Sequence, residues 1–329
     1  MSIRRFIFLI TITLVFLFIV SYASDDGKTK LKIFAQSDLS HVSNKSIQKL
    51  WETQTQLKNP ESIVYDTNND ILYVSNVDGK PDEKDNKGFI SKVSPSNGDI
   101  IELKWISNLN APKGVDVNTN TNKLYVSDLS ELIEANISNG EITNRYLAQQ
   151  QNSFLNDVVV DNQGNNVFVS DSQNNAIYKL SIGNSDGNNS LQIWLQSDEL
   201  NGPNGLLIDS KKNSLIVASM GKGTAEMGGT IKAVDLNNKT IYNLGKDDGK
   251  KVPIGILDGV EADAEEKNYY VSDWTTKNIH VVDSNGNGYY QLQDRQTQGT
   301  ADLELIDAKN IIIVPLMQEN KLVAFNVSP

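Results

Sequence analysis

Cysteine is absent from the 329-residue chain, which excludes disulfide bonds, thiolate nucleophiles and cysteine-ligated metals. Histidine occurs only twice, at His41 and His280. This scarcity argues against a histidine-ligated metal and a catalytic histidine dyad, so any general base must be a carboxylate or a metal-activated water. The formal net charge is −11, and the sequence contains no basic patch. A chain of this charge repels the phosphate backbones of nucleic acids. We therefore expect no nucleic-acid partner.

Long amphipathic helices are also missing, and the chain has a repeated β pattern instead. Six apolar segments carry a polar second residue, and each is followed by a second β-rich segment such as ILYVSN or KLYVSD. The six openings are Pro60–Asp66, Pro112–Asn118, Leu155–Asp161, Pro203–Asp209, Leu257–Asp263 and Ala301–Asp307. Steps of 52, 43, 48, 54 and 44 residues separate their second residues. Self-similarity at this period predicts an all-β, six-bladed β-propeller with one blade per repeat.

The sixth repeat supplies only three strands before Pro329. We expect the segment Ile47–Gln54, just before blade one, to serve as its missing outer strand. Such N-to-C strand closure covers both sheet edges and ties the ring shut. The propeller is therefore predicted to span residues 47–329, with residues 24–46 as a tether.

Residues 1–23 have the features of a targeting segment. Arg4 and Arg5 precede the apolar run Phe6–Tyr22, and small residues surround the end of that run. The pattern is typical of a secretory signal peptide, with an uncleaved membrane anchor as the alternative. In either case we expect export to a secreted, extracellular or periplasmic location, no other membrane contact, and a monomer. Loss of this segment removes two arginines and no acid, which takes the net charge from −11 to −13.

A propeller brings the same position of every blade to one central axis, so the second residues of the six openings should form a ring. They are Glu61, Lys113, Asn156, Asn204, Asp258 and Asp302. Glu61, Asn204 and Asp258 offer hard oxygen ligands suited to one divalent cation, Ca²⁺ first and Mg²⁺, Mn²⁺ or Zn²⁺ as alternatives. Asn156, with Asp157 beside it, could orient a substrate. The alternative is that these side chains cap strands in a polar, hydrated channel.

The same residues carry a resemblance to the regucalcin/gluconolactonase family of six-bladed propellers. Glu61 stands in PESIVYD, Asn204 in GPNGLLID and Asp258 in LDGVEAD, which resemble the openings that hold one divalent cation in that family. Asn156 in FLNDVVVD resembles the family's substrate-contacting asparagine. The resemblance implies a metal-dependent hydrolase that opens a lactone or an ester, with Asp258 as both ligand and base.

One departure affects the expected substrate. Many family members have an arginine two residues before the substrate-contacting asparagine, where this chain has Phe154. Phenylalanine cannot bind sugar hydroxyls, so a less polar lactone or ester is plausible. Lys113 could contribute positive charge as a substrate contact instead, or pair with Asp302 or Glu61 across the channel.

Three lengthened loops are expected on the face that carries the ring, as walls of a pocket or as solvated turns. They are Asp78–Gly88, Gly221–Gly229 and Lys246–Ile256. The run from Asp283 to Asp294 imitates a calcium-binding helix–loop–helix loop, but its strand-like flanks favour a hairpin. The rival function is a non-catalytic cell-surface binding propeller, because LYVSN and LYVSD also resemble the repeats of YVTN- and NHL-like proteins.

Overall fold

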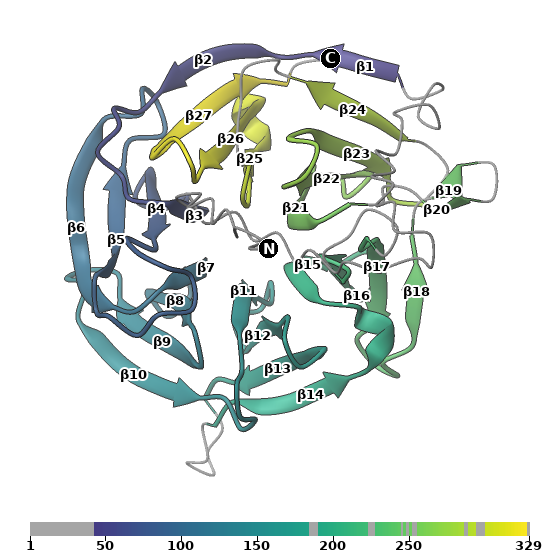
Figure 1. Cartoon of the computed structure of the whole chain (residues 1–329), viewed down its shortest axis with the longest axis horizontal. Coiled ribbons are helices and arrows are strands. Elements are labelled where there is room, and N and C mark those ends of the chain that lie inside the picture. The colour runs from purple at the N-terminus through teal and green to yellow at the C-terminus, as the bar shows by residue number, and fades with distance from the viewer. Residues whose placement is uncertain are drawn as a thin grey trace, which may run out of the picture.

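The protein is a six-bladed β-propeller, as the repeats predict. The structure, a computed structural model, describes residues 43–183, 190–222, 228–244, 246–247, 250–251, 255–285, 289–293 and 300–327. Figure 1 shows six sheets arranged around a central axis, with the first strand of each blade innermost. The predicted signal segment, residues 1–23, lies outside the described residues. No helix in the described ranges is long and apolar enough to cross a membrane.

Blades one to three are four-stranded antiparallel sheets, each built from consecutive strands that run from the axis outward. Their strands are β3 (Pro60–Asp66), β4 (Ile71–Asn76), β5 (Gly88–Val93) and β6 (Ile100–Leu109); β7 (Pro112–Asn118), β8 (Lys123–Asp128), β9 (Glu131–Asn136) and β10 (Ile142–Leu147); and β11 (Leu155–Val160), β12 (Asn166–Asp171), β13 (Ala176–Ser181) and β14 (Gln192–Gln196).

Blades four to six repeat the pattern. Their strands are β15 (Pro203–Asp209), β16 (Ser214–Ser219), β17 (Ile231–Asp235) and β18 (Ile241–Asn243); β21 (Leu257–Ala262), β22 (Asn268–Asp273), β23 (Ile279–Asp283) and β24 (Tyr289–Gln293); and β25 (Glu304–Ile306), β26 (Ile311–Leu316) and β27 (Lys321–Asn326). A short hairpin, β19 (Lys246–Asp247) with β20 (Lys250–Lys251), and the 3-10 turns η2 (Asp198–Leu200) and η4 (Asp307–Lys309) lie outside the blades.

The N-terminal part of the described chain closes the ring. Strand β2 (Gln48–Glu52) pairs antiparallel with β27 and completes blade six, which confirms the predicted closure. Strand β1 (Ser43–Ser46) pairs in parallel with β24 and adds a fifth strand to blade five. The predicted tether therefore ends in a strand, and the same segment covers the outer edges of two neighbouring blades.

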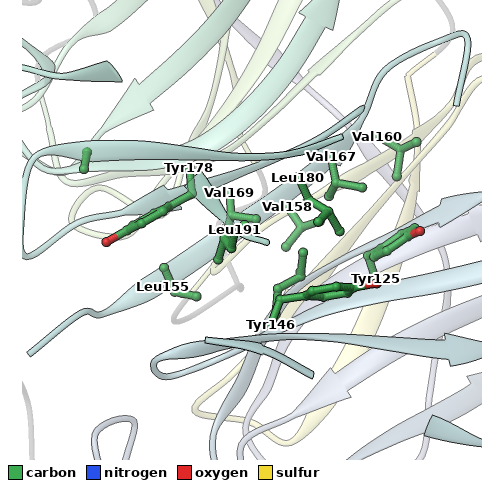
Figure 2. Close-up of a cluster of buried hydrophobic side chains, with 12 residues drawn as sticks. Tyr125, Tyr146, Leu155, Val158, Val160, Val167, Val169, Tyr178, Leu180 and Leu191 are labelled. Carbon is green, nitrogen blue, oxygen red and sulfur yellow. The ribbon is translucent and has the colours of Figure 1, made fainter. Parts of the chain in front are cut away.

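The hydrophobic core lies between the blades, and a buried cluster fills each of the six blade–blade interfaces. Figure 2 shows the cluster between blades two and three, where Tyr125 and Tyr146 face Val158 and Leu180. Burial of apolar side chains on both faces of each sheet explains why the second strands read as nearly continuous apolar runs. This core fixes where the first strands meet the axis.

Candidate functional site in the central channel

An irregularity at the start of each inner strand directs side chains into the channel. In blades one to five the strand register shifts between the first and fourth residues of the opening, for example between Pro60 and Ile63 and between Leu257 and Val260. Such a bulge leaves residues outside the regular ladder and re-aims their side chains. The second and third residues of the openings of blades three, four and five, together with Glu61 of blade one and Asp302 of blade six, line one narrow pocket on the axis.

The serine of the repeated VS(N/D) strand ends supports this bulge. Ser75, Ser170 and Ser272 each accept a hydrogen bond from the backbone N–H of the third residue of their own blade's opening, at 2.8–2.9 Å. Ser127 instead donates to the backbone carbonyl of Asn156 in the next blade. These hydroxyls therefore pair backbone groups that the interrupted ladder leaves free.

The narrow pocket is lined by five of the six predicted ring residues: Glu61, Asn156, Asn204, Asp258 and Asp302. The Nδ2 of Asn204 donates to Oδ1 of Asp258 at 2.9 Å, so these neighbouring blades are in direct contact. Asn156 is 5% exposed, and its Nδ2 donates to the hydroxyl of Ser172 at 3.2 Å.

Two ring side chains have acceptor oxygens that the described protein groups do not use. The buried Oδ1 of Asn156 has no hydrogen-bond partner among the described residues. The carboxylate of Glu61 likewise accepts no hydrogen bond from the part of the chain that the structure describes. Buried polar atoms are normally paired, so these oxygens are available to a ligand.

The carboxyls of the pocket strongly influence one another. Burial and then the charge of Asp258 raise the pKa of Glu61 well above its usual range, and the Lys113 ammonium lowers it in part. Burial and then the charge of Asp302 raise the pKa of Asp258 to about 8. Two buried carboxylates that repel each other are stabilised when a cation binds between them.

The residues present fit a divalent cation. Glu61, Asn204 and Asp258 supply two carboxylates and an amide carbonyl, which are oxygen ligands of the kind that Ca²⁺ and Mg²⁺ take. Among the described residues, no three His, Cys, Asp or Glu side chains are gathered as a metal site on their own. An ion in this pocket would therefore depend on asparagine oxygens in addition to the two carboxylates, with the amide of Asn204 turned to present its oxygen.

Lys113, the ring residue of blade two, makes its contacts beside the pocket. Lys113 is 3% exposed, and its ammonium donates to the backbone carbonyls of Pro81 at 3.0 Å and Ala111 at 3.1 Å. The same Nζ lies 4.2 Å from the ring centroid of Phe154. Burial lowers the pKa of Lys113 to about 8, against the opposing effect of Glu61. Lys113 forms no ion pair within the described ranges, so neither Asp302 nor Glu61 is its salt-bridge partner.

Blade six is one residue out of phase with the predicted ring. In blade six, Thr300 forms a β-bridge with Leu316, and Glu304 pairs with Ile313. In blade five, Leu257 pairs with Asp273, and Val260 with Val271. The two registers match when Thr300 is the first residue of the blade-six opening and Ala301 is the second. The prediction that Asp302 is a ring residue is therefore wrong. Ala301 takes that place and is fully buried.

Asp302 belongs to a second layer, made by the third residues of the openings. Its Oδ2 accepts from the Ser62 hydroxyl at 2.6 Å. Asp157 lies in the same layer and accepts the backbone N–H groups of Val158 and Leu206, both at 2.7 Å. Both oxygens of Asp157 are thus engaged, and its role as a substrate contact stays a prediction. Gly205 and Gly259 share this layer, where a Cβ would collide with the adjacent inner strand, so the channel narrows here.

A third layer, the fifth residues of the openings, was missed from the sequence. Asp116, Glu261 and Glu304 face a cavity of about 330 Å³ at the other end of the channel, with apolar residues at the remaining positions. Burial raises the pKa of Asp116 to about 7 and that of Glu304 to about 8. The missed signal is the acidic residue at the fifth position of two openings and, once the phase is corrected, of a third.

The structure also describes the predicted loop Asp78–Gly88, His280 and the predicted hairpin at Asp283. The loop Asp78–Gly88 joins β4 to β5 on the face that carries the ring, whereas Gly221–Gly229 and Lys246–Ile256 are only partly within the described residues. His280 is buried on β23 with its Nε2 3.1 Å from Asp273, away from the pocket lining, as predicted. Strands β23 and β24 pair antiparallel, which confirms the hairpin at Asp283, although Asp294 lies outside the described residues.

Comparison with known proteins agrees with this geometry. A family model described as the SMP-30/Gluconolactonase/LRE-like region matches residues 59–298, well over half of the chain. No curated protein matched the chain. The matched region contains Glu61, Asn156, Asn204 and Asp258.

Proposed function

The chain belongs to the SMP-30/Gluconolactonase/LRE-like family, and on that premise we propose that it is an exported, metal-dependent hydrolase that opens a lactone or an ester in its central channel. Members of the family are typically lactonases. The observation that carries the proposal is the convergence of Glu61, Asn204 and Asp258 in one pocket, next to the unpaired oxygen of Asn156.

The residues of the pocket would have two roles, which are to bind the cation and to transfer a proton. A divalent cation bound by Glu61, Asn204 and Asp258 would polarise the acyl carbonyl and lower the pKa of a nearby water. Asp258 accepts the proton of the attacking water as the new C–O bond forms, and returns it to the leaving oxygen as the ring or ester C–O bond breaks. The proton is thus conserved, and the products are a hydroxy acid from a lactone or an acid and an alcohol from an ester.

Asn156 would orient the substrate. Its Nδ2 donates to the Ser172 hydroxyl, which fixes the amide plane and leaves the buried Oδ1 as an acceptor on a residue that lines the pocket. A substrate hydroxyl or an ordered water would satisfy that oxygen, and pairing it on binding restores a hydrogen bond that burial otherwise denies.

The test joins metal content with hydrolysis. We expect the purified protein to retain about one divalent cation per chain by elemental analysis, and to hydrolyse members of a lactone and ester panel until EDTA removes the cation. Asp258→Ala should lose both cation and hydrolysis. A protein that holds no cation and a variant with unchanged hydrolysis would overturn the proposal and favour the binding-propeller alternative.

Export is a separate part of the proposal and rests on residues 1–23. Mass spectrometry of the protein recovered outside the cytoplasm should show a chain that begins near Ser24 if the segment is a cleaved signal. Recovery of the intact chain in the membrane fraction would identify it as an anchor, and accumulation in the cytoplasm would refute export.

A further inference from the structure

The loop Asp78–Gly88 of blade one reaches across to blade two, in front of which it passes in Figure 1. Two of its side-chain ties are exposed: Lys84 contacts the Ser130 hydroxyl at 3.4 Å, and Asp78 contacts Lys104 at 3.3 Å. Exposed ties of this kind contribute little to stability. The hydrogen bond from the Lys113 ammonium to the Pro81 carbonyl is different, because Lys113 is almost completely buried.

The ammonium of Lys113 is held mainly by contacts within the protein. A lysine carries three N–H donors, and two of them go to the carbonyls of Pro81 and Ala111. The third side of the ammonium faces the Phe154 ring at 4.2 Å, a cation–π contact. Hydrogen bonds from a charged group in a buried setting are among the stronger ones, so this arrangement is rigid.

Phe154 connects that arrangement to the pocket. It lies two residues before Asn156, and its backbone is held by Asp171 at 3.1 Å and by the N–H of Ser172 at 3.1 Å. Lys113 is close enough to Glu61 to lower the pKa of that carboxyl. The loop, the ammonium and the aromatic ring thus lie together beside the narrow pocket, next to its lining residues Glu61 and Asn156, and the side chain of Phe154 offers no hydrogen-bonding atom.

We infer that Lys113 is a positioning residue that fastens the Asp78–Gly88 loop and the Phe154 ring into one wall beside the narrow pocket, and that this wall selects lactones and esters with an apolar substituent over polyhydroxylated ones. The selectivity rests on the proposed hydrolase function, whereas the fastening does not. An alkyl substituent gains contact with the aromatic ring, while a hydroxylated one loses its hydrogen bonds to water without replacement.

The fastening is tested by limited trypsin digestion of the Ca²⁺-loaded full chain, because the loop contains the cleavage sites Lys84 and Lys87. Lys113→Met keeps the apolar stem and removes the three donors, and we expect the loop to be cut about tenfold faster. Ser130→Ala, which removes only an exposed tie, should stay within about twofold of the wild-type rate. If Lys113→Met does not fold, Lys113→Gln keeps one donor for Pro81 and should give an intermediate rate. Equal rates for wild type and the Lys113 variant would overturn the fastening.

The selectivity is tested with δ-decalactone and glucono-δ-lactone as the apolar and polyhydroxylated probes. We expect the wild type to prefer δ-decalactone in kcat/KM. Lys113→Met should raise KM for that probe about tenfold with kcat changed less than about threefold, and Phe154→Leu should reduce the preference while leaving the loop protected from trypsin.

The outcomes separate the two proposals. A wild type that hydrolyses both probes but prefers glucono-δ-lactone would overturn the selectivity and leave the hydrolase function standing. A wild type that hydrolyses neither these probes nor the wider panel would overturn the hydrolase function and the selectivity with it. The trypsin experiment decides the fastening in every case.

Discussion

Both ends of the central channel contain buried side-chain oxygens, but they differ in whether these oxygens already accept hydrogen bonds from the protein. At the far end, Asp116 accepts the backbone N–H groups of Val117 and Val160, both at 2.6 Å, and Glu304 accepts that of Tyr65 at 2.9 Å. At the ring end, the described residues leave the Glu61 carboxylate and the Asn156 oxygen without a donor. Glu261, in the same far layer, accepts no hydrogen bond from the described residues. For Asp116 and Glu304, however, backbone N–H groups already use the carboxylate, so residue type alone does not distinguish a ligand from a contact between blades.

The largest contrast should come from neutralising one carboxyl at each end. Asp258→Asn removes a ligand and the proposed base, and we expect kcat/KM for a lactone to fall by about 10³-fold. Glu261→Gln makes the same chemical change three residues further along the same strand and should leave kcat/KM within about twofold. Steady-state kinetics on both variants checks this, and equal losses would show that the whole channel rather than the ring end supports the reaction.

Cation affinity should separate the ends by a smaller factor. Asn204→Leu removes an amide ligand and its contact with Asp258, and we expect affinity for Ca²⁺ to fall about 10–100-fold. Asn162→Ala alters an exposed residue at the far cavity and should not change it. Calorimetric titration of the metal-free proteins measures both values. Weaker Ca²⁺ binding by Asn162→Ala would indicate that the cation binds at the far cavity, which would contradict our proposal.

Asn156 should matter for substrate and hardly for stability. Asn156→Leu loses the hydrogen bond to Ser172 but also removes a buried acceptor without a described partner, and these effects oppose each other. We expect the midpoint of thermal unfolding to shift by no more than about 2 °C while KM rises about tenfold. A large loss of stability with unchanged KM would indicate that Asn156 only supports the strand.

The far end should be detectable through the pH dependence of stability. Burial and then the charge of Glu304 raise the pKa of Glu261 well above its usual range, so the folded state favours the neutral acid. Its contribution is greatest below the unfolded-state pKa of about 4.3 and is lost as the pH rises through the folded-state pKa. Glu261→Gln should therefore match the wild type near pH 4 and melt about 2 °C higher at pH 8. A variant that melts lower at pH 8 would show that the charged form is stabilised instead.

Much of this arrangement was predictable from the sequence, because the repeat period fixes the blade number and four openings place Glu61, Asn156, Asn204 and Asp258 at one axis. The phase of blade six was not predictable by similarity. ADLELID and LDGVEAD share an aspartate at the second and seventh positions, and the pairings of Thr300 with Leu316 and of Glu304 with Ile313 reveal the one-residue offset.

The acidic layer at the far end and the contact of Lys113 with the Asp78–Gly88 loop could not be predicted from the sequence, for other reasons. The fifth position holds Val64, Val159 and Leu207 in three blades, so an acidic residue in the others looks like ordinary alternation along a strand. The partner of Lys113 is a backbone carbonyl of Pro81, in a loop that has no counterpart in the other repeats. Contacts to main-chain atoms of a non-repeating loop leave no trace in a repeat pattern.

The pairing of β2 with β27 joins residues more than 270 positions apart in the chain. Glu61 follows β2 closely, while Asp258 comes late, so the pocket cannot assemble until almost the whole polypeptide has emerged from the ribosome or a translocation channel. Contacts of such long sequence separation make ring completion slow compared with the folding of single blades. A chain interrupted before blade six would leave Glu61 and Asp258 on an open arc, and newly made protein should gain its chemistry in one late step.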